Sequence, residues 1–243
     1  MNPIIVILAG GLGKRMKSEL PKILHLVGNI PMLVRVIYEA RKLNSQRILI
    51  VVGQYKNIIE QTILKYTSMD DITFCIQEIP LGTGHAIQCC VNSLKKEDLE
   101  SKVLILQGDC PLMTAETVIP MLSFEHVKVM TVIKEQPSYY GRIIEEDGKF
   151  VKIVEAKDCT PDEYQITNVN CGIYSFTNKY IIKYVNDIKN ENVQGEYYLT
   201  DLIEIIKNGE EINIETYNLP QDKEYELTNV NDSDTLKLVN ERL

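Results

Sequence analysis

The chain has 243 residues, of which 44% are apolar and 25% are charged, and its formal net charge is −8. This length is close to the upper limit for one hydrophobic core, so we expect a single domain with at most a smaller lobe. The acidic balance argues against a general binder of nucleic acid or anionic membranes, because such proteins need a basic face. No apolar segment approaches the ~20 residues of a membrane span, and the N-terminus lacks the pattern of a secretion signal. We therefore expect a cytoplasmic protein whose six cysteines are reduced and take no part in metal or disulfide sites.

The first half of the chain alternates predicted strands with predicted helices. Residues 4–8 form an uninterrupted apolar run, typical of a parallel strand buried on both faces, although a short buried helix has the same composition. The alternation predicts βαβ units and a mainly parallel sheet with helices on both faces. The predicted strands are 4–8, 47–53, 72–77 and 102–107, and the predicted helices are 32–43, 57–66 and 83–94.

The second half has a different character. Residues 140–154 are typical of a β-hairpin, because Asp147-Gly148 is a strong signal for a two-residue turn. Residues 232–243 have helical spacing and either pack on the body or fray. No internal repeat is present, and in particular no hexapeptide repeat of a β-helix. The other predicted strands are 129–134, 169–176 and 212–218, and the other predicted helices are 178–188 and 198–207.

A glycine-rich loop follows the first strand. Its glycines and the cations after them are Gly10, Gly11, Gly13, Lys14, Arg15 and Lys22. Backbone N–H groups and positive side chains that converge in this way hold phosphates. The loop fits neither a Walker A motif, since Gly13-Lys14 lacks the following Ser or Thr, nor a GxGxxG fingerprint, whose last position is Met16. The alternative is a plain glycine turn with solvated charges.

Three separate segments come directly after predicted strands. Gly10, Gln77 and Asp109 lie at or just past strand ends, and ligands of such sheets bind beyond the carboxyl ends of the strands. We therefore expect these residues to meet in one crevice. A carboxylate there suits Mg²⁺, which prefers hard oxygen ligands. The alternative for Asp109 is the N-cap of the next helix, but that helix starts nearer Thr114.

A second glycine turn, Leu81-Gly82-Thr83-Gly84-His85-Ala86, opens the helix predicted at 83–94. Its backbone amides are suited to a base or phosphate oxygen, with Thr83 as the helix cap. An ordinary helix start explains the glycines equally well. We expect His85 to be a structural helix residue.

The segment LAGGLGKRMKSELPKILH resembles the opening of the nucleotidyltransferases that activate sugar phosphates. In detail it is similar to the N-acetylglucosamine-1-phosphate uridyltransferases, the N-terminal half of the bacterial bifunctional enzyme that makes UDP-N-acetylglucosamine. The resemblance continues in the same order through LGTGHA, YGRI, IVEAKD, NVNCG, QGEYYLTD and VND. It implies a Rossmann-like α/β nucleotide-diphospho-sugar transferase fold, with a mixed, mostly parallel sheet covered by helices and a smaller sugar-binding β lobe. It also implies a nucleotidyltransferase domain at 1–231, a C-terminal helix at 232–243 and no β-helix acetyltransferase domain.

The resemblance also implies the roles of particular residues. Arg15 and Lys22 are implied to be catalytic, and Asp109 and Asn231 to bind the metal, the role of Asn231 resting on resemblance alone. The implied nucleotide-binding residues are Leu8, Ala9, Gly10, Gly11, Gly13, Lys14, Gln77, Gly82 and Thr83. The implied sugar-binding residues are Gly141, Glu155, Asn170, Tyr198 and Thr200. The chain departs from the family pattern at Pro80, where a second glutamine is usual, and at Cys171, where threonine is common.

The implied reaction joins UTP and N-acetylglucosamine 1-phosphate into UDP-N-acetylglucosamine and pyrophosphate, with Mg²⁺ as cofactor. The sugar phosphate is already ionised, so it attacks in line without a general base. Three alternatives remain: the same chemistry with another sugar or nucleotide, a non-catalytic nucleotide-sugar binding protein, or a structural protein of the same fold. An oligomer is compatible with the sequence, but not the trimer of the bifunctional enzyme, which forms through its second domain.

Overall fold

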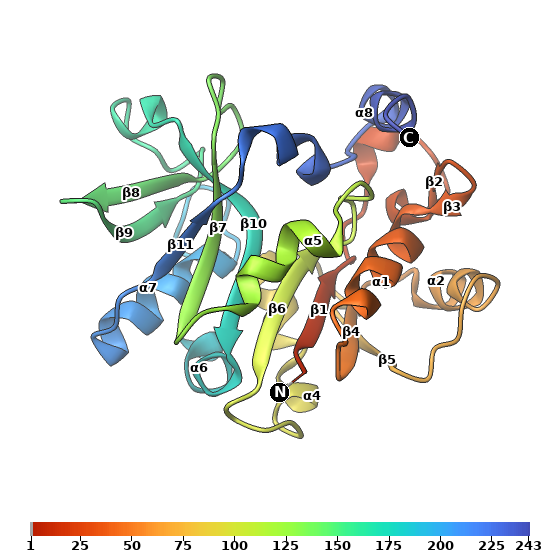
Figure 1. Ribbon diagram of the computed structural model, residues 1–243, viewed down its shortest axis with the longest axis horizontal. Helices are drawn as coiled ribbons and strands as arrows, with labels where there is room; N and C mark the ends of the chain where they lie inside the picture. The colour runs from red at the N-terminus through yellow and green to blue at the C-terminus, as the bar shows by residue number, and fades with distance from the viewer. Residues whose placement is uncertain (1) are drawn as a thin grey trace.

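A computed structural model describes residues 2–243 and shows one large sheet with helices on both sides (Figure 1). Strand β1 (Ile4–Leu8) lies near the middle and pairs in parallel with β4 (Arg47–Val52) and β6 (Lys102–Gln107). The other strands of the main path are β5 (Ile72–Ile76), β7 (Val127–Ile133), β10 (Asn168–Thr177) and β11 (Glu215–Asn218). Their order is β11-β7-β10-β6-β1-β4-β5, and β10 alone runs against its neighbours. The predicted mixed, mostly parallel sheet is therefore confirmed.

The first strand is buried on both faces, as its apolar composition predicts. Ile5 and Ile7 pack into one hydrophobic core, while Ile4 and Val6 pack into another on the opposite face. All four side chains are fully buried. Side chains that alternate between two cores are typical of a parallel strand between two helical layers. The alternative of a short buried helix is therefore wrong.

The helices divide between the two faces of the sheet. The first core contains side chains of α1 (Met32–Lys42), α2 (Lys56–Ile63) and α5 (Ala115–Val118). The second contains side chains of α3 (Thr83–Gln88), α4 (Val91–Leu94), α6 (Asn178–Tyr184) and α7 (Leu199–Glu210). No helix within residues 2–243 is both long enough and apolar enough to cross a membrane.

Two predicted helices change geometry before the end that the sequence pattern indicated, and the helix predicted at 57–66 ends at Ile63. The helix predicted at 83–94 is interrupted at Cys89 and Cys90, where Cys90 donates its amide to the carbonyl of Ile87, only three residues back. The helix predicted at 178–188 changes to 3-10 geometry at Val185–Asp187. Both changes tighten the last turns of a helix, where 3-10 bonding is common. Apolar periodicity does not reveal them, because the spacing of the apolar residues continues through each break.

The smaller β lobe is a hairpin attached to β10. Strands β8 (Arg142–Glu146) and β9 (Lys149–Val154) pair antiparallel, and β8 joins the sheet where Val169 pairs with Arg142. Asp147 and Gly148 have φ values of 50° and 71°, the positive pair that a type I′ turn requires. The predicted hairpin and its turn are confirmed.

The C-terminal helix α8 (Ser233–Asn240) packs against the N-terminal part of the chain (Figure 1). Val239 is buried in a small cluster with Val27, and the Asn240 side chain accepts a 2.8 Å hydrogen bond from the Gly28 amide. Val27 belongs to a short antiparallel ladder formed by β2 (Leu26–Val27) and β3 (Ile30–Pro31), and Gly28 lies in the turn between these strands. The helix therefore packs rather than frays, and the division into 1–231 and 232–243 stays a prediction.

Candidate active site

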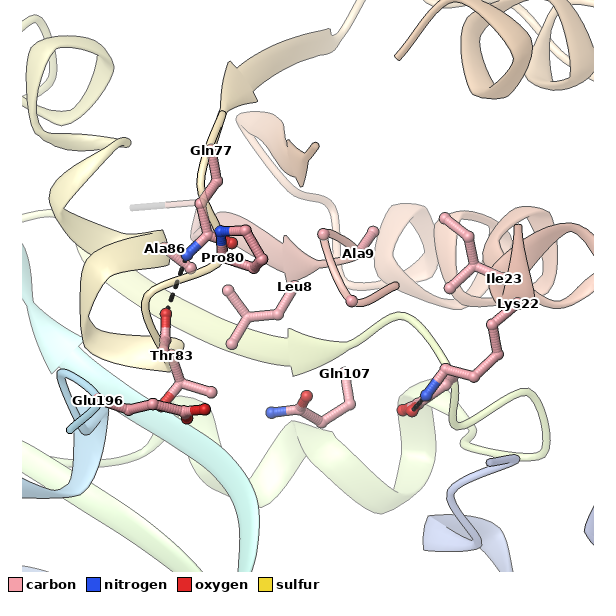
Figure 2. A pocket seen from close by; sticks show the side chains of 14 residues that line it. Leu8, Ala9, Lys22, Ile23, Gln77, Pro80, Thr83, Ala86, Gln107 and Glu196 are labelled. Carbon is pink, nitrogen blue, oxygen red and sulfur yellow. Dashed lines mark hydrogen bonds and ion pairs between the residues drawn. The ribbon is translucent and has the colours of Figure 1, made fainter. Parts of the chain in front are cut away.

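A cavity of about 260 Å³ opens at the carboxyl ends of the parallel strands (Figure 2). Gly10, Gln77 and Asp109 all line it. Strand register explains the meeting, because Leu8 is level with Val51 of β4 and with Gln107 of β6. The prediction that three distant segments share one crevice is therefore confirmed.

The cavity is lined by most of the residues that the resemblance assigns to the nucleotide. Those that line it are Leu8, Ala9, Gly10, Gly11, Gln77, Gly82 and Thr83. Gly13 and Lys14 belong to the same loop but not to the wall. A Cβ atom at Gly13 would lie 2.6 Å from the Cβ of Lys22, and its φ of +61° is left-handed. Only glycine accommodates both conditions, so Gly13 serves to bring Lys22 close to the loop.

Arg15 also lies outside the cavity wall. It belongs to a 3-10 turn, Lys14–Met16, in which Met16 is buried while both cations are exposed. The pKa of Asp232 is lowered mainly by hydrogen bonding from Thr235, and the positive charge of Arg15 also contributes. The charge of Arg15 therefore acts on Asp232, the residue directly before α8.

Lys22 joins the glycine loop to the two predicted metal ligands. Its ammonium is hydrogen-bonded to Oδ2 of Asp109 and, at 2.9 Å, to Oδ1 of Asn231. Lys22 opens the 3-10 helix Lys22–Leu24, Asp109 follows β6, and Asn231 precedes α8. The Lys22 and Asp109 side chains are only 12% and 15% exposed, so they are partly shielded from water. The fold thus brings Lys22, Asp109 and Asn231 to one point.

The oxygen atoms at this point suit a divalent cation. A carboxylate oxygen of Asp109 and an amide oxygen of Asn231 already converge on a positive charge, the Lys22 ammonium. Hard oxygen ligands of this kind are what Mg²⁺ prefers, together with water and substrate oxygens. Residues 2–243 contain no group of three or more His, Cys, Asp or Glu side chains arranged for a metal. The residues that would hold a cation here are Asp109 and Asn231.

The segment that carries Asn231 contributes another residue, Asn229, which was not predicted. Its side-chain amide donates to Oδ1 of Asp109 at 2.9 Å and to Sγ of Cys110 at 3.2 Å. Between the two asparagines, Val230 is fully buried and donates its backbone amide to the Asp109 carbonyl. The polar-apolar-polar order of Asn229, Val230 and Asn231 is the signal that was available, because alternate residues of an extended segment face the same side.

Gln77 is held in one orientation at the other end of the cavity. Its Nε2 donates to the Gly82 carbonyl at 2.9 Å, as the dashed line in Figure 2 shows, and lies 3.2 Å from Nδ1 of His85. A carbonyl only accepts, so the amide nitrogen must face Gly82. The Oε1 atom is turned toward Gly10, where an added Cβ would lie 2.9 Å from it. Gln77 therefore presents an acceptor to the glycine loop.

The second glycine turn is shaped by its contact with the QGEYY segment. The Gly84 amide donates to the Tyr197 carbonyl at 2.7 Å, and the Tyr197 amide donates to the Leu81 carbonyl at 2.8 Å. A Cβ at Gly82 would lie 2.5 Å from the Tyr197 carbonyl oxygen. The expected role of Thr83 as cap of its own helix is wrong, since its hydroxyl accepts from the Leu199 amide at the start of α7. The amide of Gly84 is likewise used within the protein.

A second cavity, of about 190 Å³, adjoins the first and shares Thr83 and Gln107 with it. Gly141, Glu155 and Asn170 line this cavity, as the resemblance implies for the sugar. Thr200 acts indirectly, since its hydroxyl donates to Oε1 of Glu155 at 3.1 Å without lining the wall. Burial raises the pKa of Glu155, and this hydrogen bond lowers it in part. Tyr198 is turned toward Asp158, to which its hydroxyl donates at 3.1 Å.

The two departures from the family pattern both lie at cavity walls. Pro80 lines the first cavity and brings no side-chain hydrogen bond to it. Cys171 lines the second cavity, where burial raises its thiol pKa to about 12. Cys171 is therefore a neutral, weakly polar group in the wall of the second cavity at pH 7.

Gln107 and Glu196 are further lining residues that were not predicted. Figure 2 shows Gln107 between Thr83 at one end of the cavity and Lys22 at the other, and Glu196 beside Thr83. Gln107 donates to the Gly172 carbonyl at 2.7 Å, which ties the end of β6 to β10. Its place as the last residue of a parallel strand was a usable signal. Glu196 gave no such signal, because only the contact between two remote loops brings it to the wall.

Comparison with known proteins finds a matching family profile and several similar proteins. The family profile of MobA-like NTP transferase domains matches residues 5–140. A protein of Acanthamoeba polyphaga mimivirus, described as a probable UDP-N-acetylglucosamine pyrophosphorylase, is 38% identical over 97% of this chain and 94% of its own length. The bifunctional protein GlmU of Caldanaerobacter subterraneus is 39% identical over 84% of this chain, and that of Clostridium acetobutylicum 39% identical over 85%. The chain spans about half the length of these GlmU proteins, 44% and 45%.

Among solved structures, a protein from Bacillus anthracis described as a glucose-1-phosphate thymidylyltransferase, in complex with sucrose, superposes with a TM-score of 0.72. The superposition covers 98% of this chain and 94% of that one at 19% identity. It establishes that the fold is shared. From the profile and the mimivirus relative together, the chain belongs to the family of MobA-like nucleotidyltransferases that includes UDP-N-acetylglucosamine pyrophosphorylases and GlmU.

Proposed function

We propose that the protein transfers uridylyl from UTP to N-acetylglucosamine 1-phosphate, giving UDP-N-acetylglucosamine and pyrophosphate. One observation carries the proposal: Lys22 contacts Asp109 and Asn231 beside a cavity of about 260 Å³, which shares Thr83 and Gln107 with a second, polar one. A reaction between two phosphates needs positive charge where both substrates meet. The names of the relatives point to the same substrates.

The fixed orientation of Gln77 favours uracil over cytosine. Its Oε1 is an acceptor, and uracil carries an N3–H donor where cytosine carries a lone pair. Turning the amide round would place its carbonyl against the Gly82 carbonyl, and a buried unpaired pair of acceptors costs about 1–3 kcal/mol. We therefore assign base reading to Gln77, with Pro80 contributing shape alone.

The second cavity suits a sugar that carries several hydroxyl donors. Glu155 uses Oε1 for the Thr200 hydroxyl, and its Oε2 lies 3.5 Å from the position of a Cβ at Gly141. Asn170 donates one amide hydrogen to the Tyr174 hydroxyl at 2.6 Å, which leaves its second hydrogen for a ligand. A partly buried carboxylate needs hydrogen-bond donors. We assign this role to the hydroxyl groups of the sugar.

The proposed uridylyl transfer requires stabilisation of negative charge and correct positioning of the two substrates, and it requires no general base from the protein. An ionised oxygen of the sugar phosphate attacks the α-phosphorus of UTP, a new P–O bond forms, and the bond to pyrophosphate breaks on the opposite side. Lys22 neutralises the phosphates from within the cavity, and Lys14 and Arg15 approach the triphosphate from the rim of the loop. Asp109 and Asn231 would hold a Mg²⁺ ion, which would supply further positive charge at the reacting phosphates. The glycine loop contributes backbone N–H groups.

The proposal is tested by pyrophosphate release across a panel of nucleotides and sugar phosphates. We expect turnover with UTP and N-acetylglucosamine 1-phosphate that exceeds turnover with CTP, dTTP or glucose 1-phosphate. A preference for dTTP and glucose 1-phosphate would assign the same chemistry to other substrates. Binding of UDP-N-acetylglucosamine without pyrophosphate release in any combination would identify a nucleotide-sugar binding protein and overturn the proposal.

A further inference from the structure

We propose that Asn229 is a positioning residue, which fixes the Asp109 carboxylate for the divalent cation through its side-chain amide. The inference rests on the proposed function only in taking Asp109 as a metal ligand. The contact itself is direct: Nδ2 of Asn229 donates to Oδ1 of Asp109 at 2.9 Å.

The orientation of the Asn229 amide is determined by its neighbours. The Asp109 carboxylate is an acceptor, so the nitrogen and not the oxygen of the amide must face it. The second amide hydrogen is directed to Sγ of Cys110, 3.2 Å away, and Cys110 is only 1% exposed. Both N–H groups of Asn229 therefore bind the Asp109-Cys110 segment.

The two carboxylate oxygens of Asp109 have different partners. Oδ1 is held by Asn229, and Oδ2 is held by Lys22, which also binds Asn231. Asn229 makes no hydrogen bond to Lys22 or to the oxygen of Asn231, so it does not compete with a cation for the converging pair of oxygens. Partners behind a ligand that hold it in one orientation are a general feature of metal sites. Asn229 has that position relative to Asp109.

The backbone holds Asn229 in place independently of the metal. The Val230 amide donates to the Asp109 carbonyl at 2.9 Å, and the fully buried Val230 side chain anchors the segment. From this anchored segment, residues 229–231, Asn229 reaches Asp109 and Asn231 reaches Lys22. Asn229 also lines the sugar cavity, so a role in sugar binding must be separated from a role in positioning Asp109.

The experiment compares Asn229→Ala with Thr228→Val. Thr228 is the adjacent residue; its hydroxyl donates to the Tyr225 carbonyl at 2.7 Å and makes no hydrogen bond to Asp109. Pyrophosphate release is measured against Mg²⁺ concentration at saturating substrates. We expect the Mg²⁺ concentration for half-maximal rate to rise about tenfold in Asn229→Ala, with turnover restored at high Mg²⁺ and little change in the KM for the sugar phosphate. Thr228→Val remains within about twofold of the wild-type protein.

A second readout does not depend on turnover. Mn²⁺ binding is measured by electron paramagnetic resonance on Lys22→Ala and on the double variant Lys22→Ala/Asn229→Ala, because removal of the ammonium opens the cation position. We expect the double variant to bind Mn²⁺ about tenfold more weakly. Equal Mn²⁺ affinities, absence of Mn²⁺ binding by Lys22→Ala, or a changed sugar KM without a changed metal dependence would each overturn the proposal. If wild-type protein releases no pyrophosphate, the proposed function fails, and the Mn²⁺ comparison still decides the role of Asn229.

Discussion

The ammonium of Lys22 binds the carboxylate of Asp109, 87 positions along the chain, at the place where two oxygen ligands converge. The same ammonium binds Asn231, 209 positions away. A single positive charge thus occupies the position that we propose for a divalent cation. Metal binding and the position of Lys22 are therefore linked, since the two charges cannot share the site without repulsion.

Lys22→Ala is predicted to have opposite effects on metal affinity and on turnover. Removal of the ammonium leaves Asp109 and Asn231 free, so Mn²⁺ binding without nucleotide becomes tighter than in the wild-type protein. Turnover falls roughly 100-fold, because a charge that stabilises the transition state is lost. Mn²⁺ titration and pyrophosphate release measure the two effects. Lys65→Ala, which removes an exposed lysine, serves as control, and weaker Mn²⁺ binding by Lys22→Ala would show that the ammonium is not in the cation position.

Gln77→Leu is predicted to reduce the preference for UTP over CTP. Leucine is apolar and of similar size, so the variant loses the acceptor that faces the base and the donor to the Gly82 carbonyl. We expect kcat/KM for UTP to fall by tenfold or more, about the effect of one buried hydrogen bond to a substrate, while CTP changes little. Competition between the two nucleotides in one reaction measures the ratio. An unchanged ratio would place base recognition elsewhere in the cavity.

Gly82→Ala is predicted to destabilise the protein far more than Gly195→Ala. Both glycines have positive φ, but Gly195 has open space around it, whereas a Cβ at Gly82 would lie 2.5 Å from the Tyr197 carbonyl oxygen. Gly82 also has φ 114° and ψ 173°, a region almost restricted to glycine. We expect the free energy of unfolding to fall by about 1 kcal/mol in Gly195→Ala and by about 2 kcal/mol more in Gly82→Ala. Urea unfolding measures both, and equal losses would contradict the close packing of the two loops.

Asp201→Asn is predicted to change the pH dependence of stability. Burial, with smaller contributions from Glu155, Glu204 and Asp158, raises the pKa of Asp201 from 3.8 to about 6. The folded state therefore keeps a proton that the unfolded chain releases, and the contribution of Asp201 to stability falls as the pH rises from about 4 to about 6. Asp201 is partly exposed, and after that exposure is discounted the free energy of unfolding falls by about 1 kcal/mol over this pH range. The melting temperature of Asp201→Asn relative to wild type should be higher at pH 8 than at pH 4, and a difference independent of pH would contradict this.

The alternation of strands and helices along the first half of the chain, and the position of the site, followed from local patterns. An apolar run followed by glycines placed β1 and its loop, and the strand-end rule placed Gly10, Gln77 and Asp109 together. Gln107 was available from the same rule. The alternation of Asn229, Val230 and Asn231 indicated which side chains share a side, but not that Asp109 lies there.

The remaining features depend on contacts between distant segments. The Gly82 turn packs on Tyr197 through backbone atoms, which leave no trace in composition or periodicity. That contact turns the Thr83 hydroxyl to the Leu199 amide and places Glu196 at the cavity wall. The change of helix geometry at Cys89 and Cys90 is likewise a matter of hydrogen-bond partners and not of apolar spacing. Sequence patterns along the chain do not specify which hydrogen-bond partners distant segments supply.

The most direct measurement is a crystal structure of the protein with UDP-N-acetylglucosamine and Mg²⁺. We predict uracil against Oε1 of Gln77, the sugar in the cavity lined by Glu155 and Asn170, and the cation on Asp109 and Asn231 with the Lys22 ammonium moved to the phosphates. A nucleotide sugar bound elsewhere, or a cation that contacts neither Asp109 nor Asn231, would contradict the proposed site.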